Sequence, residues 1–458
     1  MIRNIIARLE QFEGRAENET VVRDLNSMLP GMLLEQVAAI FLENINVFVM
    51  GFISTAAIAG VGQVNTLNNV LMNLFQAFAI GGTVIVSQHA GAGRNRQAAN
   101  SAFSALLLGS AVSILITIGI YLFRSPLILL LFGDAEEEVI QNSIAYFNFT
   151  ALTPPLWFLY FQCCGFMRGA GDTRRPMLIS IALNVTSMIL NLVFSLGMDL
   201  GVTGAALSYL LSVGLAAGIS LAMVLRKSFL FRPRRPDSQL SPDIKRIGRI
   251  SFPSAAENIM FNGSKLVIQI FVAGMGTTMI SANSVFNSVN SIFNVPFMAL
   301  YCLVVPVVSH CAGCGDREKT SHALQYVFRR GFVWSLPIAA AHLLLSVPGS
   351  YLFSRDTAVI KIAAVMLAVY AVAALFQNGS YILPNGFKTV GDANFSMVVS
   401  SVTAWIIRVF GTWFLGVHLG WGAYAIAVTQ LLDIAVRSVI YQMRFRHGTW
   451  LKEFSPAK

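Results

Sequence analysis

Long apolar runs alternate along the chain with short polar segments that carry most of the charges. A helix needs about 20 apolar residues to cross a bilayer, and the runs lack the two-residue alternation of a membrane β-barrel. They predict an all-α polytopic membrane protein with twelve transmembrane helices. The expected spans are 29–50, 61–88, 99–122, 136–165, 175–198, 203–225, 250–273, 279–310, 323–346, 357–383, 394–415 and 421–443.

One connection is longer and more basic than the others, and it divides the spans into two sets of six. This predicted cytoplasmic linker covers residues 226–249, between six-helix bundles at 29–225 and 250–443. Residues 1–28 and 444–458 are the expected cytoplasmic termini. The first of these has apolar residues at helical spacing, which fits either an amphipathic helix on the membrane or a frayed terminus.

Composition supports a membrane protein and excludes a large catalytic domain. Charged residues make up 12% of the chain, about half of the roughly 25% that is usual in soluble domains. The apolar residues, at 55%, leave no long polar segment outside the spans. The five cysteines do not form the framework of a disulfide-rich secreted domain.

The basic residues predict the orientation. Of the 32 Lys and Arg residues, 24 fall in the termini and in alternate loops, and Arg168 and Lys388 belong to this set. The opposite loops hold only Arg124 and Arg355. The positive-inside rule therefore places both termini in the cytoplasm and the protein in the cytoplasmic (inner or plasma) membrane. The basic residues behind the net charge of +10 then face anionic lipid, and no nucleic acid partner is expected.

The second half of the chain repeats the first. At an offset of 222, Glu35 falls on Glu257, and VSQHAGAG at 86–93 falls on VSHCAGCG at 308–315. At 220–221, GFMRGAGD at 165–172 falls on GFKTVGD at 386–392. Two copies with six spans each have the same orientation and are related by a pseudo-two-fold axis along the membrane normal. Parallel repeats of this kind are typical of transporters, with the substrate site between the halves. The repeated glycines indicate turn or packing geometry.

At these motifs the chain resembles a known family. The VSQ–AGAG turn, the MRGAGDTRRPM segment, LGVTGAA and the closing IIRVFGTWFLG–HLGWGAYAIA are similar to the bacterial multidrug and toxic compound extrusion (MATE) transporters. The resemblance covers residues from about 28 to 446. It implies two six-helix bundles in a V-shape, which export organic cations or other amphipaths by alternating access. Inward flow of Na⁺ or H⁺ is the implied driving force, and no other cofactor is expected.

Ionisable residues inside spans are functional candidates, because burying a charge in the bilayer is costly. Glu35 and Glu257 are matched acids, and we expect them to be the coupling-ion or proton sites. Glu43 and Lys265 also occupy matched positions and can contribute to the substrate cavity. The alternative is structural, with Glu43 and Lys265 paired and the other acids hydrated.

Asparagines form two one-sided stripes, which fit either the walls of a water-filled cleft or hydrogen bonds between helices. The cavity candidates among them are Asn65, Asn68, Asn287 and Asn290; the other members are Asn69, Asn73, Asn283 and Asn294.

The chain departs from the family pattern at the cation sites that the resemblance implies. In the first span, INVFVMG places Asn46 where many relatives have an acid. In the fifth span, Asn191 and Ser195 stand where one branch has Asn-x-x-x-Asp. Phe261 stands where another branch has an acid. Neither family site is intact, so Glu35 and Glu257 are the expected replacements.

Three other spans hold ionisable residues with a structural interpretation. Asp433 and Arg437 are four residues apart and should neutralise each other. Arg408 needs a carboxylate from another helix or a lipid headgroup. His342 is expected near an outer helix end, without a role.

Other chemistry is not supported. The chain lacks a GxxxxGK[ST] phosphate loop, and the Cys311–Cys314 pair falls on His89 and Ala92 in the repeat, so no metal site is expected. The sequence therefore predicts no enzyme but a monomeric antiporter of small amphipathic, cationic substrates in contact with membrane lipid. The alternatives are a flippase of lipid-linked or other anionic amphipaths from the same superfamily and an intramembrane receptor or scaffold. A major-facilitator carrier is disfavoured by AGAGRNRQAAN after the second span.

Overall fold

The described residues of a computed structural model are almost entirely helical and contain no β-strand. They are 19–50, 55–132, 136–226, 229, 232–233 and 243–451, without the side chains of 19–20, 24, 39–50, 55–56, 58 and 273. The predicted all-α fold class is confirmed. The chain forms two compact units: residues 30–255 make the N-terminal unit, and residues 1–29 with 256–458 make the C-terminal unit. The unit boundaries fall inside the long helices α2 (Glu19–Met50) and α10 (Asp243–Ala273).

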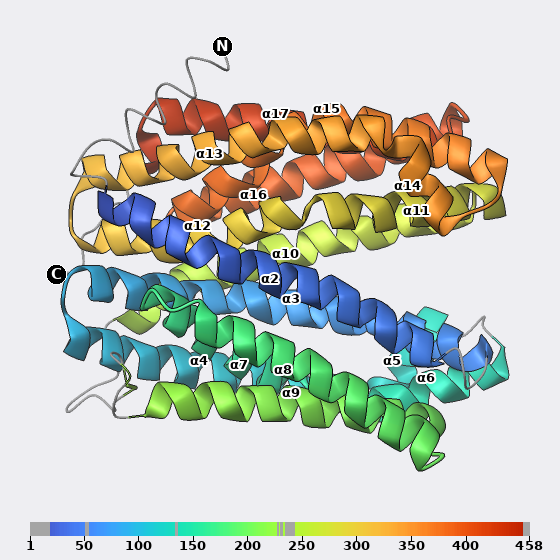
Figure 1. The fold of residues 1–458 in the computed structure, drawn as a ribbon, viewed down its shortest axis with the longest axis horizontal. Helices are drawn as coiled ribbons and strands as arrows, with labels where there is room; N and C mark the ends of the chain where they lie inside the picture. Colours follow the sequence, from blue (N-terminus) through green and yellow to red (C-terminus); the bar gives the residue numbers. More distant parts are fainter. Residues whose placement is uncertain are drawn as a thin grey trace. The chain divides into compact units, whose positions relative to one another are not determined.

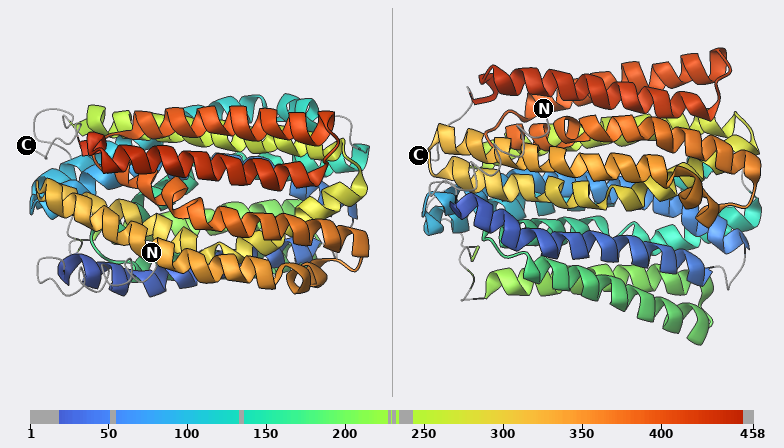
Figure 2. Two further views of the ribbon diagram at one scale, coloured as in Figure 1. Left: turned by 90° about the horizontal axis from the view of Figure 1, so that it is seen from above. Right: turned by 45° about the horizontal axis from the view of Figure 1, so that its top comes forward.

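The helices of the N-terminal unit run side by side along one common direction (Figures 1 and 2). The long helix α3 is central and packs against α4, α6 and α7, while α9 packs against α6, α7 and α8. Their bounds are α3 (Thr55–Gly91), α4 (Asn95–Leu122), α5 (Arg124–Phe132), α6 (Glu137–Thr150), α7 (Pro154–Gly169), α8 (Arg174–Asn191), η2 (Leu192–Gly197) and α9 (Gly201–Leu225).

The C-terminal unit is organised around one buried helix, α15 (Thr357–Lys388), which packs against α11, α12, α13, α14, α16 and α17. Apolar residues of α10, α11, α15, α17 and the π-helix η3 form one core cluster of this unit. The other bounds are α11 (Thr277–Phe293), α12 (Val295–Gly313), α13 (Arg317–Leu344), α14 (Ser346–Phe353), α16 (Ala393–Thr403), η3 (Ala404–Phe410), η4 (Trp413–His418), α17 (Ala423–Arg446) and η5 (Thr449–Leu451).

Several predicted spans are broken helices. The fourth is interrupted between α6 and α7 just before Pro154, and the eighth between α11 and α12 at Asn294. Proline explains both breaks, since Pro155 and Pro296 lie in the first turn of the following helix and cannot continue the preceding one. In the ninth span, α13 and α14 are bent by 64°. The fifth and eleventh spans both end in π-helix, at η2 and η4.

The predicted glycine-rich turns are helix C-caps that repeat in the two units. After α7, Asp172 N donates to Met167 O (3.0 Å) and Gly171 N donates to Arg168 O (2.9 Å). After α15, the Asp392 and Gly391 amides donate in the same pattern. This is the Schellman motif, and its left-handed position explains the glycines, because φ is +81° at Gly171 and +98° at Gly391.

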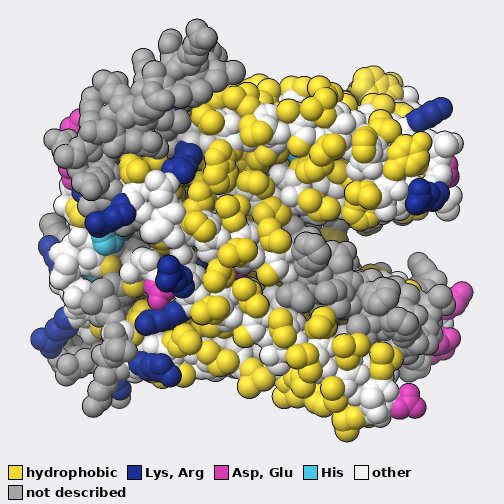
Figure 3. Space-filling model, in the orientation of Figure 1, with side chains coloured by type: hydrophobic (Ala, Val, Ile, Leu, Met, Phe, Trp, Pro, Cys, Tyr) yellow, Lys and Arg dark blue, Asp and Glu magenta, His cyan; other side chains and the backbone are white. Residues whose placement is uncertain are grey.

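The surface of each unit fits a membrane environment. Hydrophobic side chains cover the middle of the helices, and charged side chains gather toward the helix ends (Figure 3). In the described part of the chain, eight helices are long and apolar enough to cross a membrane, or nine if α13 and α14 form one span.

A substitution at Gly171 tests the C-cap. We expect Gly171→Ala to lower the free energy of unfolding by about 1 kcal/mol, because an L-residue is strained at this positive φ. Gly119→Ala is the matched control: Gly119 lies inside α4, where an added Cβ would meet no neighbouring atom within 4 Å, so alanine should leave stability unchanged or raise it. Thermal unfolding of both purified variants is the measurement, and equal effects would contradict the assignment.

Candidate functional site

A buried ion pair joins α2 and α7 of the N-terminal unit. Glu35 on α2 accepts a hydrogen bond at Oε1 from Arg168 Nη2, at 2.7 Å. The Glu35 side chain is 9% exposed, and its Oε2 is buried without a hydrogen-bond partner in the described structure. Arg168 lies in the last turn of α7, where a cation is favoured by the helix dipole. The carboxylate is thus neutralised but keeps one free oxygen.

The C-terminal unit repeats this arrangement with different donors. Lys388 Nζ, in the last turn of α15, lies 2.9 Å from Glu257 Oε2 on α10. Ser400 Oγ on α16 donates to Glu257 Oε1 at 2.8 Å and also lies 3.0 Å from Tyr441 Oη on α17. Glu257 therefore connects four helices of this unit through polar contacts.

The bases come from matched positions, just as the acids do. Arg168 and Lys388 are 220 residues apart and precede the two Schellman turns. The charge pattern predicts both in cytoplasmic loops, and the loop assignment is wrong: both are helical, and their side chains are only 13% and 6% exposed. The signal that could have identified them was their position in the repeat, three residues before a shared glycine.

A second cluster in the C-terminal unit gathers cations around the ring of Phe261. Lys265 Nζ lies 4.8 Å from the ring centroid, and the Cζ atoms of Arg408 and Arg437 each lie 5.2 Å from it. Asp433 is fully buried, and its Oδ2 lies 2.7 Å from Arg437 Nη2 and 3.8 Å from Arg408 Nε. The predicted Asp433–Arg437 pair is confirmed, and the same carboxylate attracts Arg408.

The asparagine stripes do not have a single role. In the first stripe, Tyr146 Oη donates to Asn65 Oδ1 at 3.1 Å, between α6 and α3. Asn68 is buried, and neither of its amide atoms has a hydrogen-bond partner in the described structure. In the second stripe, Asn287 is exposed and Asn290 is half-buried.

Asn290 belongs to a polar network at the break between α11 and α12. Asn294 Nδ2 lies 2.7 Å from Asn290 Oδ1, and His342 Nε2 on α13 lies 3.0 Å from the same atom. The other ring nitrogen of His342, Nδ1, lies 2.8 Å from Ile338 O. His342 is completely buried and contacts the rings of Phe293 and Tyr370. It therefore joins two interrupted spans, which the sequence did not predict for this residue.

The remaining cavity candidates have separate positions. Asn191 accepts a hydrogen bond at Oδ1 from Ser195 Oγ at 2.7 Å, where α8 passes into the π-helix η2. Lys265 is exposed on α10. The side chains of Glu43 and Asn46 lie outside the described residues.

A third ionic group lies at the start of α10 in the N-terminal unit. Asp243, the first residue of this helix, lies 2.8 Å from His89 Nε2 and accepts a hydrogen bond from Ser101 Oγ at 2.6 Å. Arg246 Nη1 lies 3.2 Å from its other oxygen. Burial alone would raise the pKa of Asp243, but the hydrogen bonds from His89 and Ser101 and the charges of His89 and Arg246 hold that pKa well below its usual range.

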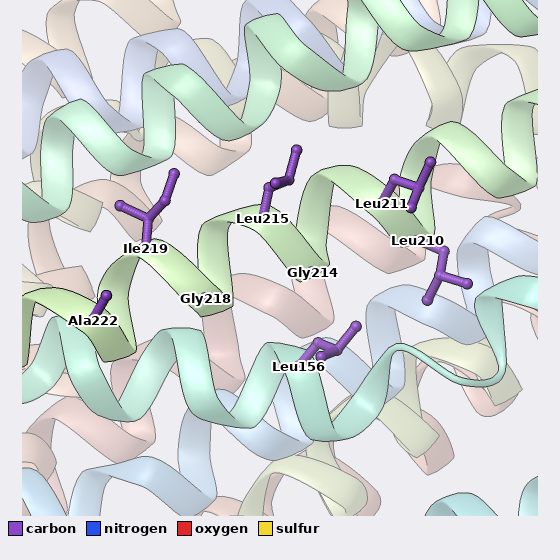
Figure 4. Close-up of a pocket in the computed structure, with 8 residues that line it drawn as sticks. All are labelled: Leu156, Leu210, Leu211, Gly214, Leu215, Gly218, Ile219 and Ala222. Carbon is purple, nitrogen blue, oxygen red and sulfur yellow. The ribbon is translucent and has the colours of Figure 1, made fainter. Parts of the chain in front are cut away.

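An apolar hollow of about 540 Å³ lies between α7 and α9 on the N-terminal unit (Figure 4). Leucine, isoleucine, alanine and glycine form its whole lining, so it offers no polar group to fix a ligand. Among the described residues, no group of three His, Cys, Asp or Glu side chains is arranged to hold a metal ion.

Comparison with known proteins supplies the family context. The MatE family model matches residues 31–193 and 253–414, one match in each half of the chain. The probable multidrug resistance protein NorM of Thermotoga maritima is 23% identical over 412 residues, covering 88% of this chain and 87% of the relative.

Solved structures show the same fold. An outward-facing multidrug resistance MATE family transporter of the MOP superfamily matches with a TM-score of 0.86 and 17% identity, covering 96% of this chain and 98% of the other. A MOP superfamily transporter from Pyrococcus furiosus matches with a TM-score of 0.85 and 18% identity, covering 96% and 98%. That transporter is described as having a binding pocket of reverse polarity, which suggests a different function.

The Asp243 group predicts a pH-dependent stability. A carboxyl with a lowered folded-state pKa stabilises the fold above its unfolded pKa of about 4, and this contribution is lost as the pH falls through the folded-state value. Asp243→Asn should therefore reduce thermal stability at pH 6–8 and matter progressively less below pH 4. Unfolding temperatures of wild type and variant across this range provide the test. A difference that grows on acidification would disprove the assignment.

Proposed function

Because the chain belongs to the MatE family of transporters, we propose that it is a secondary active antiporter that exports small amphipathic molecules in exchange for H⁺ or Na⁺. Transport proceeds by alternating access in the cytoplasmic membrane, with the monomer as the working unit. The observation that supports this most directly is the matched pair of buried carboxylate–base contacts, Glu35–Arg168 and Glu257–Lys388.

An exchange of cations at one carboxylate explains coupling. A buried acid without a positive partner is strongly disfavoured in a membrane protein. If the base withdraws during the transport cycle, the acid must take a proton or Na⁺ in its place. Glu257 suits this role because Ser400 holds one carboxylate oxygen while Lys388 faces the other. The ion gradient is thereby coupled to the state of α10 and α15.

The same pairs bear on the substrate. Glu35 and Glu257 alone would favour organic cations as the transported molecules, but each of them already has a base at hydrogen-bonding distance. A cationic substrate must therefore compete with Arg168 or Lys388 for its carboxylate. Such competition gives exchange between substrate and coupling ion without a separate binding site for each.

A second candidate function is the flipping or export of anionic amphipaths. The specific observation in its favour is the excess of cations around Phe261. Arg408 and Arg437 share one carboxylate, Asp433, and Lys265 lies beside them.

Dye efflux from proteoliposomes tests the antiport. Wild type should move a fluorescent amphipathic dye against its gradient when either an H⁺ or a Na⁺ gradient is imposed, and Glu257→Gln should reduce this movement to the level of empty liposomes. The reason is that the neutral glutamine amide has no negative charge with which to bind the coupling ion. Glu318→Gln is the matched control, because Glu318 lies in the same unit with a side chain that is 83% exposed.

The fold of the variant needs its own control. Removing one partner of a buried pair typically costs about 3–5 kcal/mol. Glu257→Gln leaves the charge of Lys388 buried without its acid, so this variant should be less stable than wild type. The double variant Glu257→Gln/Lys388→Met removes both charges and should unfold at a higher temperature than the single variant, yet remain uncoupled. Full gradient-driven efflux by the double variant would exclude Glu257 as the coupling acid.

A further inference from the structure

The C-terminal unit contains an excess of positive charge at one place, and two of the three cations are buried. Lys265 on α10, Arg408 on η3 and Arg437 on α17 each lie within about 5 Å of the Phe261 ring. Arg408 and Arg437 are 6% and 3% exposed. Like charges repel more strongly in such a setting than in water, because the surroundings screen them less. Three cations around one ring therefore need negative charge nearby to neutralise them.

The acids in this unit leave that excess uncompensated. Asp433 contacts Arg437 and, more distantly, Arg408, so its single charge is shared between them. Glu257 is a further acid whose charge acts on Arg437, and Lys388 already neutralises it. Lys265 makes no ion pair with an acid in the described part of the chain. Two positive charges remain, and the quadrupole of the Phe261 ring attracts a cation without cancelling its charge.

Hydrogen-bond donors point to the same deficit. The Nε atoms of Arg408 and Arg437 are buried without a hydrogen-bond partner in the described structure. A buried guanidinium normally uses its donors on a carboxylate, a phosphate or a carbonyl. These two arginines have donor capacity that Asp433 alone does not satisfy.

The cluster has an open side and an aromatic wall. Lys265 is exposed, whereas the two arginines behind Phe261 are buried. Tyr381 on α15 adds a second ring, 5.8 Å from Arg437 Cζ. A ligand that enters past Lys265 meets cationic donors next to aromatic surface, which suits a molecule that carries both an anionic group and an apolar body.

The cluster is a departure from the internal repeat. When Gly422 is aligned with Gly201, Asp433 and Arg437 fall on Ser212 and Ala216 of α9. The glutamate–base pairs occur in both units, whereas these residues occur in one. A feature that the shared fold does not require is better explained by a task of the C-terminal unit.

We propose that the Lys265–Arg408–Arg437 cluster of the C-terminal unit binds the anionic group, a carboxylate, sulfonate or phosphate, of an amphipathic substrate. This assignment deepens the proposed transport function and rests on it, because the cluster would select among the molecules that the protein moves. Arg408 and Arg437 receive the anion, while Asp433 fixes their orientation. Lys265 supplies attraction at the open side, and the aromatic rings contact the apolar body.

Binding to purified protein without any ion gradient tests the assignment separately from transport. The probes share one dansyl fluorophore: dansylglycine carries a carboxylate, dansylamide is neutral and dansylcadaverine carries an ammonium. We expect affinity to fall in that order. Lys265→Met should weaken dansylglycine binding by about tenfold or more, the usual effect of losing one hydrogen bond to a charged group. It should not weaken binding of dansylcadaverine.

Two variants control for folding and for net charge. Lys265→Arg retains the charge and should keep most of the dansylglycine affinity. Lys361→Met removes a lysine that is exposed near the start of α15 in the same unit, and it should leave dansylglycine binding unchanged. Stronger binding of dansylcadaverine than of dansylglycine, or equal dansylglycine affinity in wild type and Lys265→Met, would overturn the proposal. Neither outcome depends on whether a gradient drives efflux. A failure of the proposed anion site can therefore be distinguished from a failure of the proposed antiport.

Discussion

An ionisable side chain among membrane helices needs a partner of opposite charge, and this constraint organises both units. Leaving a carboxylate or an ammonium group unpaired in a low-dielectric interior costs several kcal/mol. The acid lies on α2 in the N-terminal unit and on α10 in the C-terminal unit, and a later helix provides the base at the turn that ends in a Schellman glycine. The turn geometry and the ion pair therefore depend on each other. The glycine lets the helix end there, and the end of the helix presents the base.

Interrupted helices supply the second constraint. A backbone group inside a membrane must be satisfied, so breaks are tolerated where other groups compensate. At the break between α11 and α12, the side chains of Asn290, Asn294 and His342 meet. At the start of the π-helix η2, Asn191 and Ser195 bond to each other. Polar residues in the spans thus mark places where the helices depart from regular geometry, and such places are where helices most easily change shape.

The fold was largely predictable because its signals are local and repeated. Continuous apolar runs identify helices, and proline explains the breaks near residues 154 and 294. The ion pairs of the candidate site were harder to predict from the sequence. Asp433 and Arg437 could be matched because they are four residues apart on one helix, whereas Glu35 and Arg168 are separated by 133 positions. Counting charges identifies loops on average, but it assigned Arg168 and Lys388 to loops. In the sequence, a basic residue in the last turn of a helix cannot be told from one in the loop that follows.

The two units share one framework but differ in what they add to it. The paired glutamates belong to both, so they represent what the repeated unit needs to fold and, in the proposed mechanism, to exchange an ion. The cationic cluster lies in the C-terminal unit, and its members come from α10, η3 and α17. Two of these helices also contact the Glu257 network, since Glu257 lies on α10 and Tyr441 lies on α17. An anion bound at Arg408 and Arg437 would therefore act on the same helices as Glu257, the acid that exchanges its cation in the proposed mechanism. The proposed coupling between substrate and ion then requires no long pathway, because both partners would influence one set of neighbouring helices.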